Sequence, residues 1–332
     1  MIISKTPFRI SLFGGGTDYP SWYRNNGGSV LATAIDKYCY ISCRHLPPFF
    51  DHKHRIVYSK VESVNEIEEI QHPSVRAVLS TLGTNAGLEI HHDGDLPAHS
   101  GLGSSSSFTV GLINSLNALK GLQASKEDLA KQAIYIEQEV IKENVGSQDQ
   151  ISAAFGGFNK IDFNTDDSFN ITPVIISKDL TEKLQDHILL FFTGLSRFSS
   201  EIAKDKIANI KNHFRELTQI KEMVNEGLSI LHRPSDSIKD LGKLLHESWK
   251  LKRSLSTKVS TPKIDEIYET GIKAGAIGGK ILGAGGGGFI LFFAAPENHN
   301  KIIDRLKRLV HVAFKFDNTG SKIVVYEPNG FK

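Results

Sequence analysis

Apolar positions at helical spacing follow directly after a run of small polar residues near position 100. They fall three residues apart, which places them on one face of a helix, at Val110, Ile113, Leu116 and Leu119. Residues 97–107 read Pro-Ala-His-Ser-Gly-Leu-Gly-Ser-Ser-Ser-Ser, so the helix is expected to begin near Ser104 or Ser105. The pattern predicts a glycine- and serine-rich loop that ends at the N-terminus of a buried helix.

The rest of the chain alternates between strand-like and helix-like segments. Short β-rich segments bounded by Gly or Pro predict strands at 2–13 with a break at Pro7, 29–34, 38–44, 55–58, 88–92, 158–163, 171–176, 187–193, 280–282, 289–294, 312–316 and 323–326. Amphipathic segments predict helices at 72–82, from a capping box at Ser125 to about Lys142, from 146 to 155, and at 198–231, 235–256, 262–274 and 297–309. The strands at 158–163, 171–176 and 187–193 are expected to form a second layer.

Length and composition are those of an ordinary globular protein. With 332 residues, the chain is long enough for two domains or one large composite domain. The hydrophobic fraction is 40% and the net charge is +2, which gives no reason to expect a nucleic acid or a membrane as partner. No signal peptide and no apolar run long enough to span a bilayer is apparent, and Cys39 and Cys43 are expected to be buried, reduced thiols. These features favour a cytoplasmic protein.

The loop before the helix has the chemistry of a polyphosphate site. A helix N-terminus offers unpaired N–H groups and about +0.5 of an elementary charge, and Gly101 and Gly103 let the backbone approach a ligand closely. The motif is neither a Walker loop, since no Gly-Lys follows, nor a dinucleotide fingerprint, since Ser106 stands where a third glycine belongs. A flexible turn with serine capping is the alternative.

Two other glycine-rich segments are candidate ligand contacts. Gly14-Gly15-Gly16-Thr17-Asp18 brings backbone close to a carboxylate that can accept two sugar hydroxyls. Taken by itself, this segment favours the alternative, a turn in which Asp18 caps residues 20–23. The loop at 283–288 spells G-x-G-x-x-G, but a strand follows it, which excludes the dinucleotide fold. It is either a wide hairpin turn or a loop that packs against another loop's phosphates.

Taken together, three motifs resemble those of the GHMP small-molecule kinase family, in the family's order and over nearly the whole chain. They are Pro7–Tyr19, Pro97–Ser107 and Lys280–Phe289. The first motif is most similar to the sugar-1-kinases. Further segments resemble the D-glycero-D-manno-heptose 7-phosphate kinases, at 58–62, 72–76, 145–150, 193–197 and 246–252.

The resemblance implies an α+β, two-domain GHMP kinase fold with the active site between the domains. The N-terminal domain would be similar to ribosomal protein S5 domain 2, and the C-terminal domain would be ferredoxin-like. We place the division at residues 1–185 and 186–332. A return of the extreme C-terminus to the N-terminal part stays open.

The resemblance also implies the ligands, ATP and Mg²⁺, and the residues that hold them. Ser105 and Glu137 match the family's magnesium ligands, although Glu137 by itself would be taken for a residue on a solvated helix face. One hydroxyl and one carboxylate suffice for a magnesium ion that also holds phosphate and water. The expected ATP contacts are Pro97, Ser100, Gly101, Leu102, Gly103, Ser104, Ser105, Ser106, Gly285 and Gly286.

Asp149 and Arg9 match the family's catalytic pair. Asp149 would either take the proton of the acceptor hydroxyl or only orient that hydroxyl, and Arg9 would keep it ionised; a helix cap is the structural alternative for Asp149. The expected acceptor contacts are Gly16, Thr17 and Asp18 for sugar hydroxyls, and Arg197, with Lys252 and Arg253 as further candidates, for a distal phosphate.

The activity that the resemblance implies is ATP-dependent phosphorylation of the anomeric hydroxyl of D-glycero-D-manno-heptose 7-phosphate, a step toward GDP-heptose for surface polysaccharide. The alternatives are a 1-kinase for fucose, galactose or a uronic acid, and a non-catalytic sugar sensor; a nicotinamide oxidoreductase is remote. The expected partners are a sugar phosphate and ATP, with the chain acting as a monomer or homodimer.

Overall fold

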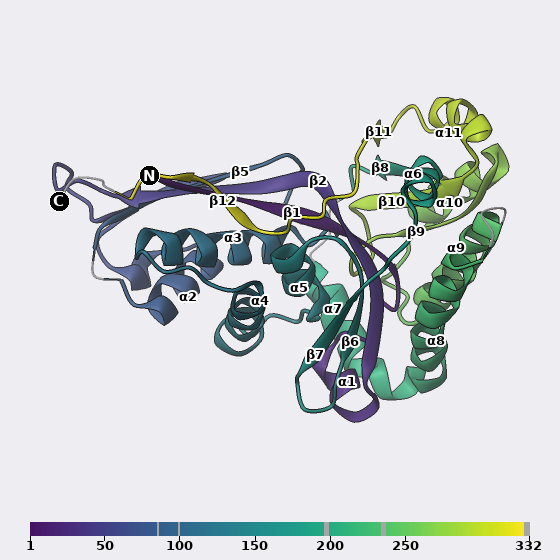
Figure 1. Cartoon of the computed structure of the whole chain (residues 1–332), viewed down its shortest axis with the longest axis horizontal. Coiled ribbons are helices and arrows are strands. Elements are labelled where there is room, and N and C mark those ends of the chain that lie inside the picture. The colour runs from purple at the N-terminus through teal and green to yellow at the C-terminus, as the bar shows by residue number, and fades with distance from the viewer. Residues whose placement is uncertain (85, 99, 196–198, 234–236, 329–332) are drawn as a thin grey trace.

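The computed structural model of the chain (Figure 1) describes residues 1–332 except 85, 99, 196–198, 234–236 and 329–332. Its strands form two sheets, with the larger one ordered β12-β1-β2-β5-β3-β4 and extended by β6 on β2 and β7 on β6, and the smaller one ordered β11-β8-β10-β9. The strands are β1 (Ile2–Phe13), β2 (Gly28–His45), β3 (His54–Val57), β4 (Val61–Val64), β5 (Leu88–Gly94), β6 (Phe158–Phe163), β7 (Phe169–Pro173), β8 (Ile188–Phe192), β9 (Ala276–Ile281), β10 (Phe289–Ala294), β11 (Val310–His311) and β12 (Lys322–Tyr326).

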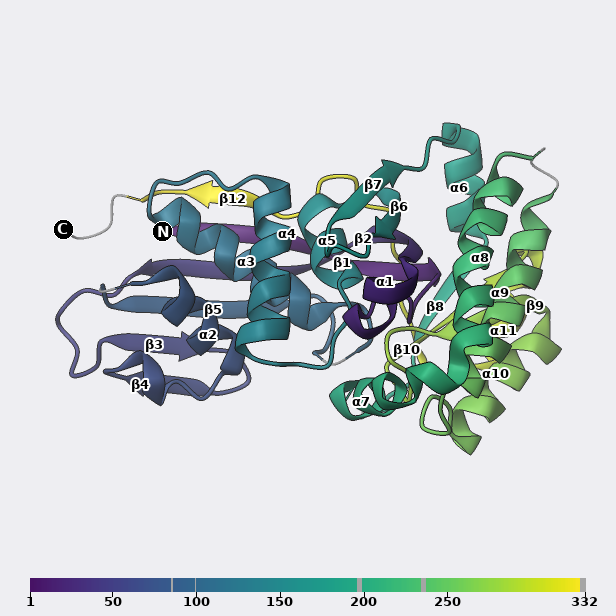
Figure 2. The ribbon, with the colours of Figure 1, turned by 90° about the horizontal axis from the view of Figure 1, so that it is seen from below.

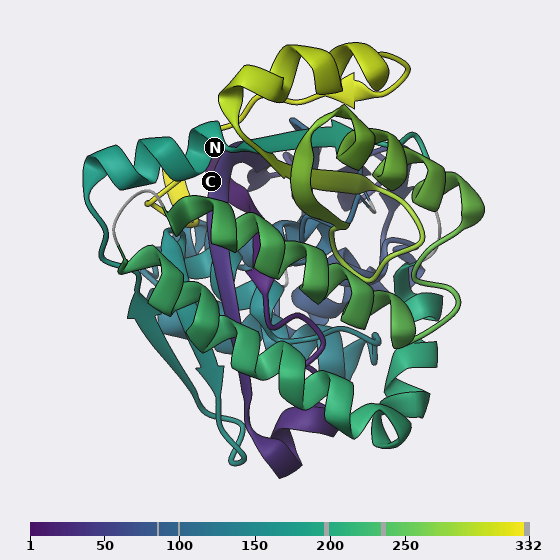
Figure 3. The ribbon, with the colours of Figure 1, turned by 90° about the vertical axis from the view of Figure 1, so that its right-hand side faces the viewer.

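Helices cover both sheets. They are α1 (Pro20–Asn26), α2 (Pro73–Leu82), α3 (Ser104–Leu119), α4 (Lys126–Tyr135), α5 (Gln148–Phe155), α6 (Lys178–Asp186), α7 (Ser199–Asn209), α8 (Phe214–Leu231), α9 (Ile238–Ser254), α10 (Pro262–Ala274) and α11 (His299–Arg305). In Figure 2, α2, α3 and α4 lie over one face of the larger sheet, and α3 packs on β1 and β2. Figure 3 shows α8 and α9 side by side, and α9 also packs on β9.

The predicted helix behind the glycine-serine loop is confirmed, since α3 begins at Ser104 and ends at Leu119. The break expected at Pro7 is only a shift of register between Pro7 and Phe8, because a bulge accommodates a residue that has no N–H to donate. The strands expected at 29–34 and 38–44 are one long strand, β2, which pairs with β1, β5 and β6. The prediction of a second layer was wrong for β6 and β7, which extend the larger sheet, and was confirmed for β8, which belongs to the smaller sheet.

The helix expected from Ser125 to Lys142 is interrupted. Ser125 caps it as predicted, but α4 ends at Tyr135 and the chain continues as a π-helical turn, Ile136–Val140. Lys142 then has a positive φ of 62°, so the helical path stops there. The hydrophobic pattern gave no sign of the turn, because a π turn adds one residue without changing the polarity of the segment. Neither α6 nor β4 was predicted.

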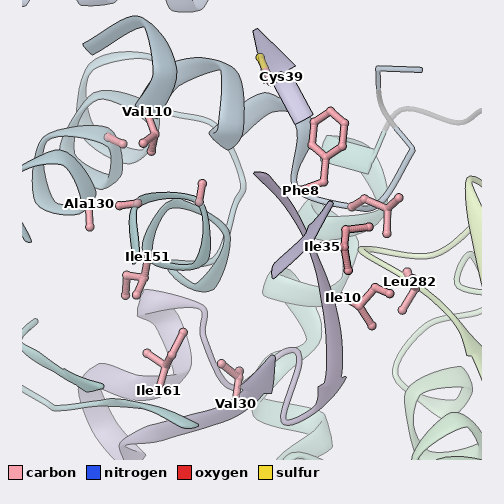
Figure 4. Packing of buried hydrophobic residues seen from close by; sticks show 14 of the residues in the cluster. Phe8, Ile10, Val30, Ile35, Cys39, Val110, Ala130, Ile151, Ile161 and Leu282 are labelled. Carbon is pink, nitrogen blue, oxygen red and sulfur yellow. The ribbon is translucent and has the colours of Figure 1, made fainter. Parts of the chain in front are cut away.

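The main hydrophobic core is continuous across the two sheets. Figure 4 shows Phe8 and Ile10 of β1 near Ile35 of β2, with Leu282 of the second sheet's glycine loop close to Ile10. These side chains and Val110 of α3 belong to one buried cluster. The last strand, β12, pairs antiparallel with β1, so the C-terminal segment joins the larger sheet. This packing holds the ends of β1 and β9 at a fixed junction.

Cys39 and Cys43 are buried free thiols on β2, as expected from the sequence. Burial raises the pKa of the Cys43 thiol to about 12, with a small opposing effect of the N-terminal charge. Among the described residues, no helix is long and apolar enough to cross a membrane.

Candidate active site

A cavity lies where the larger sheet meets the smaller one. The segments that line it come from both halves of the chain: β1 and the loop after it, the glycine-serine loop with the start of α3, the segment that enters α5, and parts of α7, α9 and β9. The cavity therefore collects all three glycine-rich motifs that the sequence singled out.

The glycine-serine loop presents a bare helix N-terminus to this cavity. Gly103 is the N-cap of α3, has a φ of +78° and provides no side chain to cap the helix. The loop is tied to both sheets, because the Leu102 carbonyl accepts a hydrogen bond of 3.0 Å from the Arg9 N–H, and the Ser100 carbonyl accepts one of 3.1 Å from the Phe289 N–H. The first residues of α3, Ser104, Ser105 and Ser106, line the cavity. The N–H groups of a helix's first turn have no partner within the helix, so this end of α3 fits an anionic ligand.

The third glycine loop packs backbone against backbone on this phosphate loop. A Cβ on Gly283 would come within 2.5 Å of the Gly101 Cα, so only glycine fits there. Gly283 and Ala284 line the cavity, whereas Gly285 and Gly286, which were the expected ATP contacts, do not. Those two glycines pack on Val259, and the Gly286 N–H donates to the Val259 carbonyl at 2.8 Å. The loop is thus both a turn between β9 and β10 and a support for the phosphate loop.

Arg9 and Asp149 form a bidentate ion pair at the centre of the cavity. The Arg9 Nε donates to Asp149 Oδ1 at 2.7 Å and the Arg9 Nη2 donates to Oδ2 at 2.8 Å, while Nη1 donates to the Gly101 carbonyl at 2.8 Å. The Arg9 side chain is 4% exposed and that of Asp149 is 26% exposed. A buried fork on a partly open carboxylate fixes the carboxylate's orientation toward the cavity. Asp149 lies in the first turn of α5 without capping its N-terminus, because the cap residue is Ser147.

Asp18 forms a second carboxylate of the cavity. Its Oδ1 accepts from the Gly16 N–H at 2.8 Å and its Oδ2 from the Gln148 Nε2 at 2.9 Å. Burial raises the pKa of Asp18, the Gly16 hydrogen bond opposes this, and the charge of Asp149 adds to it. Asp18 does not cap α1, whose cap residue is Tyr19. A carboxylate held in this way is suited to accept hydrogen bonds from hydroxyl groups.

Unsatisfied polar atoms lie beside Asp18. Ser11 Oγ and Gln148 Oε1 are buried and have no hydrogen-bond partner among the described residues, and both residues line the cavity. Buried polar atoms in native proteins are normally paired, so these two are candidate contacts for a ligand hydroxyl or amine. The sequence analysis assigned neither residue to the acceptor.

The position of Thr17 differs from the expectation that this residue contacts the sugar. Its side chain is fully buried, and its Oγ1 lies 2.8 Å from the Gly14 carbonyl, 2.9 Å from the Ser29 carbonyl and 3.1 Å from the Ser29 N–H. The hydroxyl hydrogen is used on backbone carbonyls, and the side chain has no surface that a ligand could reach. Thr17 therefore holds the loop against β2 and is not a sugar contact, whereas Gly16 does line the cavity.

The π-helical turn after α4 turns Glu137 inward. Glu137 is fully buried, and its Oε2 accepts hydrogen bonds from the Ser106 Oγ at 2.8 Å and the Gln150 Nε2 at 2.5 Å. Its Oε1 has no hydrogen-bond partner in the described part of the chain. Burial raises the pKa of Glu137 to about 7 against the hydrogen bonds from Thr109 and Ser106. Glu137 is not on a solvated helix face.

A magnesium ion fits these donors. Mg²⁺ prefers a few carboxylate and hydroxyl oxygens together with phosphate oxygens and water, and the orphaned Oε1 of Glu137 is such an oxygen. Of the two serines, Ser106 donates its hydroxyl to Glu137, whereas Ser105 is placed by the structure only in the cavity lining. Magnesium ligation by Ser105 stays a prediction.

Three buried lysines complete the cavity lining. Lys206 of α7, Lys252 of α9 and Lys280 of β9 are 6%, 7% and 4% exposed. Of these three lysines, only Lys252 was predicted as a candidate phosphate contact. Lys280 was part of a motif, but no role was predicted for it. Nothing in the sequence predicted that Lys206 is part of a site, because a lysine on an amphipathic helix is ordinarily solvated.

The remaining expected site residues that the structure describes, among them Ser100, do not line the cavity. Pro97 is exposed and does not line it, and the Leu102 side chain is buried in the main hydrophobic core. Arg253 is paired with Asp265 at 3.0 Å near the surface. Arg197 lies outside the described residues.

Comparisons with known proteins agree with the arrangement of motifs. The model of the GHMP kinases N-terminal domain matches residues 70–157, and that of the GHMP kinases C-terminal domain matches 231–311. A D-glycero-alpha-D-manno-heptose 7-phosphate kinase of Campylobacter jejuni is 29% identical over 320 residues, which cover 92% of this chain and 93% of that protein. An L-fucokinase/L-fucose-1-P guanylyltransferase of Bacteroides fragilis is 24% identical, over 89% of this chain and 34% of its own length.

A solved structure extends the agreement to the fold. The crystal structure of a D-glycero-D-manno-heptose 1-phosphate kinase from Bacteroides thetaiotaomicron superposes with a TM-score of 0.79 at 22% identity, covering 98% of this chain and all of that one. Together with the two domain models, this likeness confirms the α+β fold with its N- and C-terminal GHMP domains. The chain belongs to the GHMP kinase family and is an ATP-dependent phosphotransferase with an alcohol group as acceptor.

Proposed function

We propose that this kinase phosphorylates the anomeric hydroxyl of D-glycero-D-manno-heptose 7-phosphate to give the 1,7-bisphosphate, in the synthesis of GDP-activated heptose. The observation that carries the proposal is that one cavity holds the phosphate loop, the Arg9–Asp149 pair and Asp18. The relative from Campylobacter jejuni supports the choice of sugar, since the similarity extends over nearly both chains.

The phosphate loop would hold the ATP phosphates. The N–H groups at the start of α3 would donate to phosphate oxygens, as helix N-termini commonly do. Glu137 and a serine hydroxyl, of Ser105 or Ser106, would hold Mg²⁺. The bound ion supplies charge neutralisation on the phosphates, which phosphoryl transfer needs more than covalent chemistry.

Asp149 and Arg9 would act on the acceptor side of the transfer. Asp149 presents a fixed carboxylate to the cavity and would accept a hydrogen bond from the anomeric hydroxyl, either to orient it or to take its proton. Arg9 would hold the carboxylate in its orientation and add positive charge near the transferring group. Asp18, Gly16, Ser11 and Gln148 would bind the remaining hydroxyls of the sugar.

The test is ADP release with purified enzyme over a panel of acceptors: the heptose 7-phosphate, the same heptose without phosphate, L-fucose, D-galactose and D-galacturonate. We expect kcat/KM for the heptose 7-phosphate to exceed that for each other sugar by about 100-fold or more, because unpaired buried polar groups in the site penalise the wrong acceptor. Phosphorus NMR of the product should show a phosphate on the anomeric carbon. A higher kcat/KM for fucose, galactose or the uronic acid would replace the heptose with that sugar, and no ADP release with any acceptor would favour a sugar sensor.

A further inference from the structure

Three lysines from distant parts of the chain meet in the cavity with little access to water. The Lys280 Nζ donates to the Leu12 carbonyl at 2.9 Å, and the Lys252 Nζ donates to the Ile281 and Gly283 carbonyls at 2.6 and 2.7 Å. The Lys206 Nζ donates to the Ala284 carbonyl. An ammonium group has three N–H donors. These contacts therefore leave two donors on Lys206, two on Lys280 and one on Lys252.

The lysines have no carboxylate partner in the structure. Among the described residues, none of the three forms an ion pair, since Asp149 is engaged by Arg9 and Asp18 by the Gly16 N–H and Gln148. Buried charges without a counterion are costly, and they occur where a ligand or a partner supplies the opposite charge. Burial, followed by repulsion from the neighbouring cations, lowers the pKa of Lys252 and of Lys280, the latter to about 7. Within the described part of the chain, the three ammonium groups thus have no counter-charge paired with them.

Lys206 and Lys252 are held by carbonyls at or beside the loop that packs on the phosphate loop. The anchor of Lys280 and the nearby charge of Asp18 favour the acceptor end of the cavity. Lys280 is anchored on the carbonyl of Leu12, just before the loop that carries Asp18. Burial lowers the pKa of Lys206, and the negative charge of Asp18 opposes this, as it does for Lys252 and Lys280. The remaining carboxylate of the lining, Glu143, instead raises the pKa of Glu137, the residue that would hold Mg²⁺.

We propose that Lys206, Lys252 and Lys280 bind the phosphate ester at the far end of the sugar acceptor. The inference rests on the proposed function, because it assumes a phosphorylated sugar in the Asp18 subsite. Ammonium groups bind a phosphate dianion with charge-assisted hydrogen bonds, and an acceptor without the phosphate leaves the three charges buried and unpaired. The lysines therefore select phosphorylated over unphosphorylated sugars.

Lys206→Met and Lys280→Met test the proposal. Methionine keeps an apolar stem of similar length and removes the buried charge. We expect each variant to raise KM for the heptose 7-phosphate by about 10- to 100-fold, the range of one hydrogen bond to a charged group, and to leave KM for ATP within about threefold. Activity on the unphosphorylated heptose should not fall.

Lys250→Met is the matched control. Lys250 is on α9, like Lys252, but it is exposed and paired with Glu247 at 2.8 Å. It should leave both KM values unchanged. Thermal unfolding of each variant establishes that it is folded at the assay temperature.

A measurement on the unaltered enzyme keeps the proposal testable if the lysine variants do not fold. Inorganic phosphate should inhibit competitively against the heptose 7-phosphate and not against ATP. Inhibition competitive with ATP, or variants that raise KM for ATP instead, would assign the lysines to the nucleotide and overturn the proposal. An equal loss on phosphorylated and unphosphorylated heptose would also overturn it.

These assays distinguish a failure of the proposed function from a failure of the lysine site alone. If the unaltered enzyme prefers an unphosphorylated sugar, the heptose 7-phosphate assignment fails, and the inference fails with it. If the unaltered enzyme prefers the heptose 7-phosphate but the lysine variants keep that preference, the function stands and the lysine site alone is wrong.

Discussion

The two walls of the cavity are built in different ways. The donor wall consists of Gly101, Gly103, Ser104, Ser105 and Ser106, which belong to one continuous segment with backbone N–H groups at the start of α3. The acceptor wall is assembled from separate elements and consists of Asp18, Gln148, Lys206, Lys252 and Lys280. By the proposed function, the donor wall would bind through main-chain N–H groups, while the acceptor wall would bind through polar and charged side chains.

This difference indicates where specificity lies. Backbone N–H groups and a helix N-terminus recognise phosphate groups generally, so a family can keep the donor wall while its acceptors differ. A wall made of side chains from five segments changes with single substitutions. Asp149 and Arg9 lie between the walls, and their replacement should have the largest effect.

Asp149→Asn should lower kcat by about 10²- to 10⁴-fold, the usual contribution of a positioned general base. Asparagine keeps the shape of the side chain but loses the negative charge that the buried Arg9 requires. The dissociation constant of ATP, measured by calorimetry, should stay within about threefold because the donor wall is untouched.

Asp167→Asn is the matched control for that substitution. Asp167 also accepts from an arginine Nε at 2.7 Å, that of Arg24, but the pair is exposed. Its turnover should equal that of the unaltered enzyme. Full turnover by Asp149→Asn would remove Asp149 from the reaction.

Glu137→Gln should lower turnover by about 100-fold or more, since it removes a carboxylate that would hold Mg²⁺, yet it should stabilise the fold at pH 8 without Mg²⁺. Burial raises the pKa of Glu137 from 4.5 to about 7. The folded state then binds this proton more tightly than the unfolded state does. The contribution of Glu137 to the free energy of unfolding is therefore fully present below pH 4.5 and is lost as the pH rises to 7. The loss is roughly 3 kcal/mol.

Denaturant unfolding of both proteins at pH 8 and pH 5 measures this effect. The stability advantage of Glu137→Gln should be largest at pH 8 and small at pH 5, and Mg²⁺ with ADP should reduce it at pH 8. An advantage that does not change with pH would mean that Glu137 is not a buried acid.

Two glycine substitutions test whether the donor wall and the acceptor wall bind different substrates. A Cβ on Gly146 would overlap Oδ2 of Asp18, so Gly146→Ala should raise KM for the sugar by about 10-fold or more and spare ATP. A Cβ on Gly103 would lie 3.4 Å from side-chain atoms of Arg9 and Asp149 at a φ of +78°. Gly103→Ala should therefore raise KM for ATP, at a cost in stability of about 1–2 kcal/mol.

Steady-state kinetics with each substrate varied in turn decides between the two effects. If both variants raise the same KM, the cavity does not have separate donor and acceptor walls. If neither variant changes a KM, the glycines serve folding alone.

The same contrast explains what the sequence could predict. The start of α3 was predicted well because its signals are contiguous, and the pairing of Arg9 with Asp149 followed from a resemblance of motifs. The inward position of Glu137 depends on a π turn that polarity does not encode. Of the acceptor wall, Asp18 and Lys252 were named from the resemblance of motifs, but the roles of Lys206 and Lys280 could not be predicted, since these two meet only through the packing of the two sheets.

Thr17 marks the limit of motif reasoning, because it stands between two cavity residues, Gly16 and Asp18, without being one. Thr17→Val keeps the shape of the side chain and leaves the Gly14 carbonyl and the Ser29 N–H without their hydroxyl partner. The free energy of unfolding should fall by about 1–3 kcal/mol, while KM for sugar and for ATP stay within about threefold. A selective rise in the sugar KM at unchanged stability would return Thr17 to the acceptor wall, whereas a loss of stability alone assigns its hydroxyl to the loop.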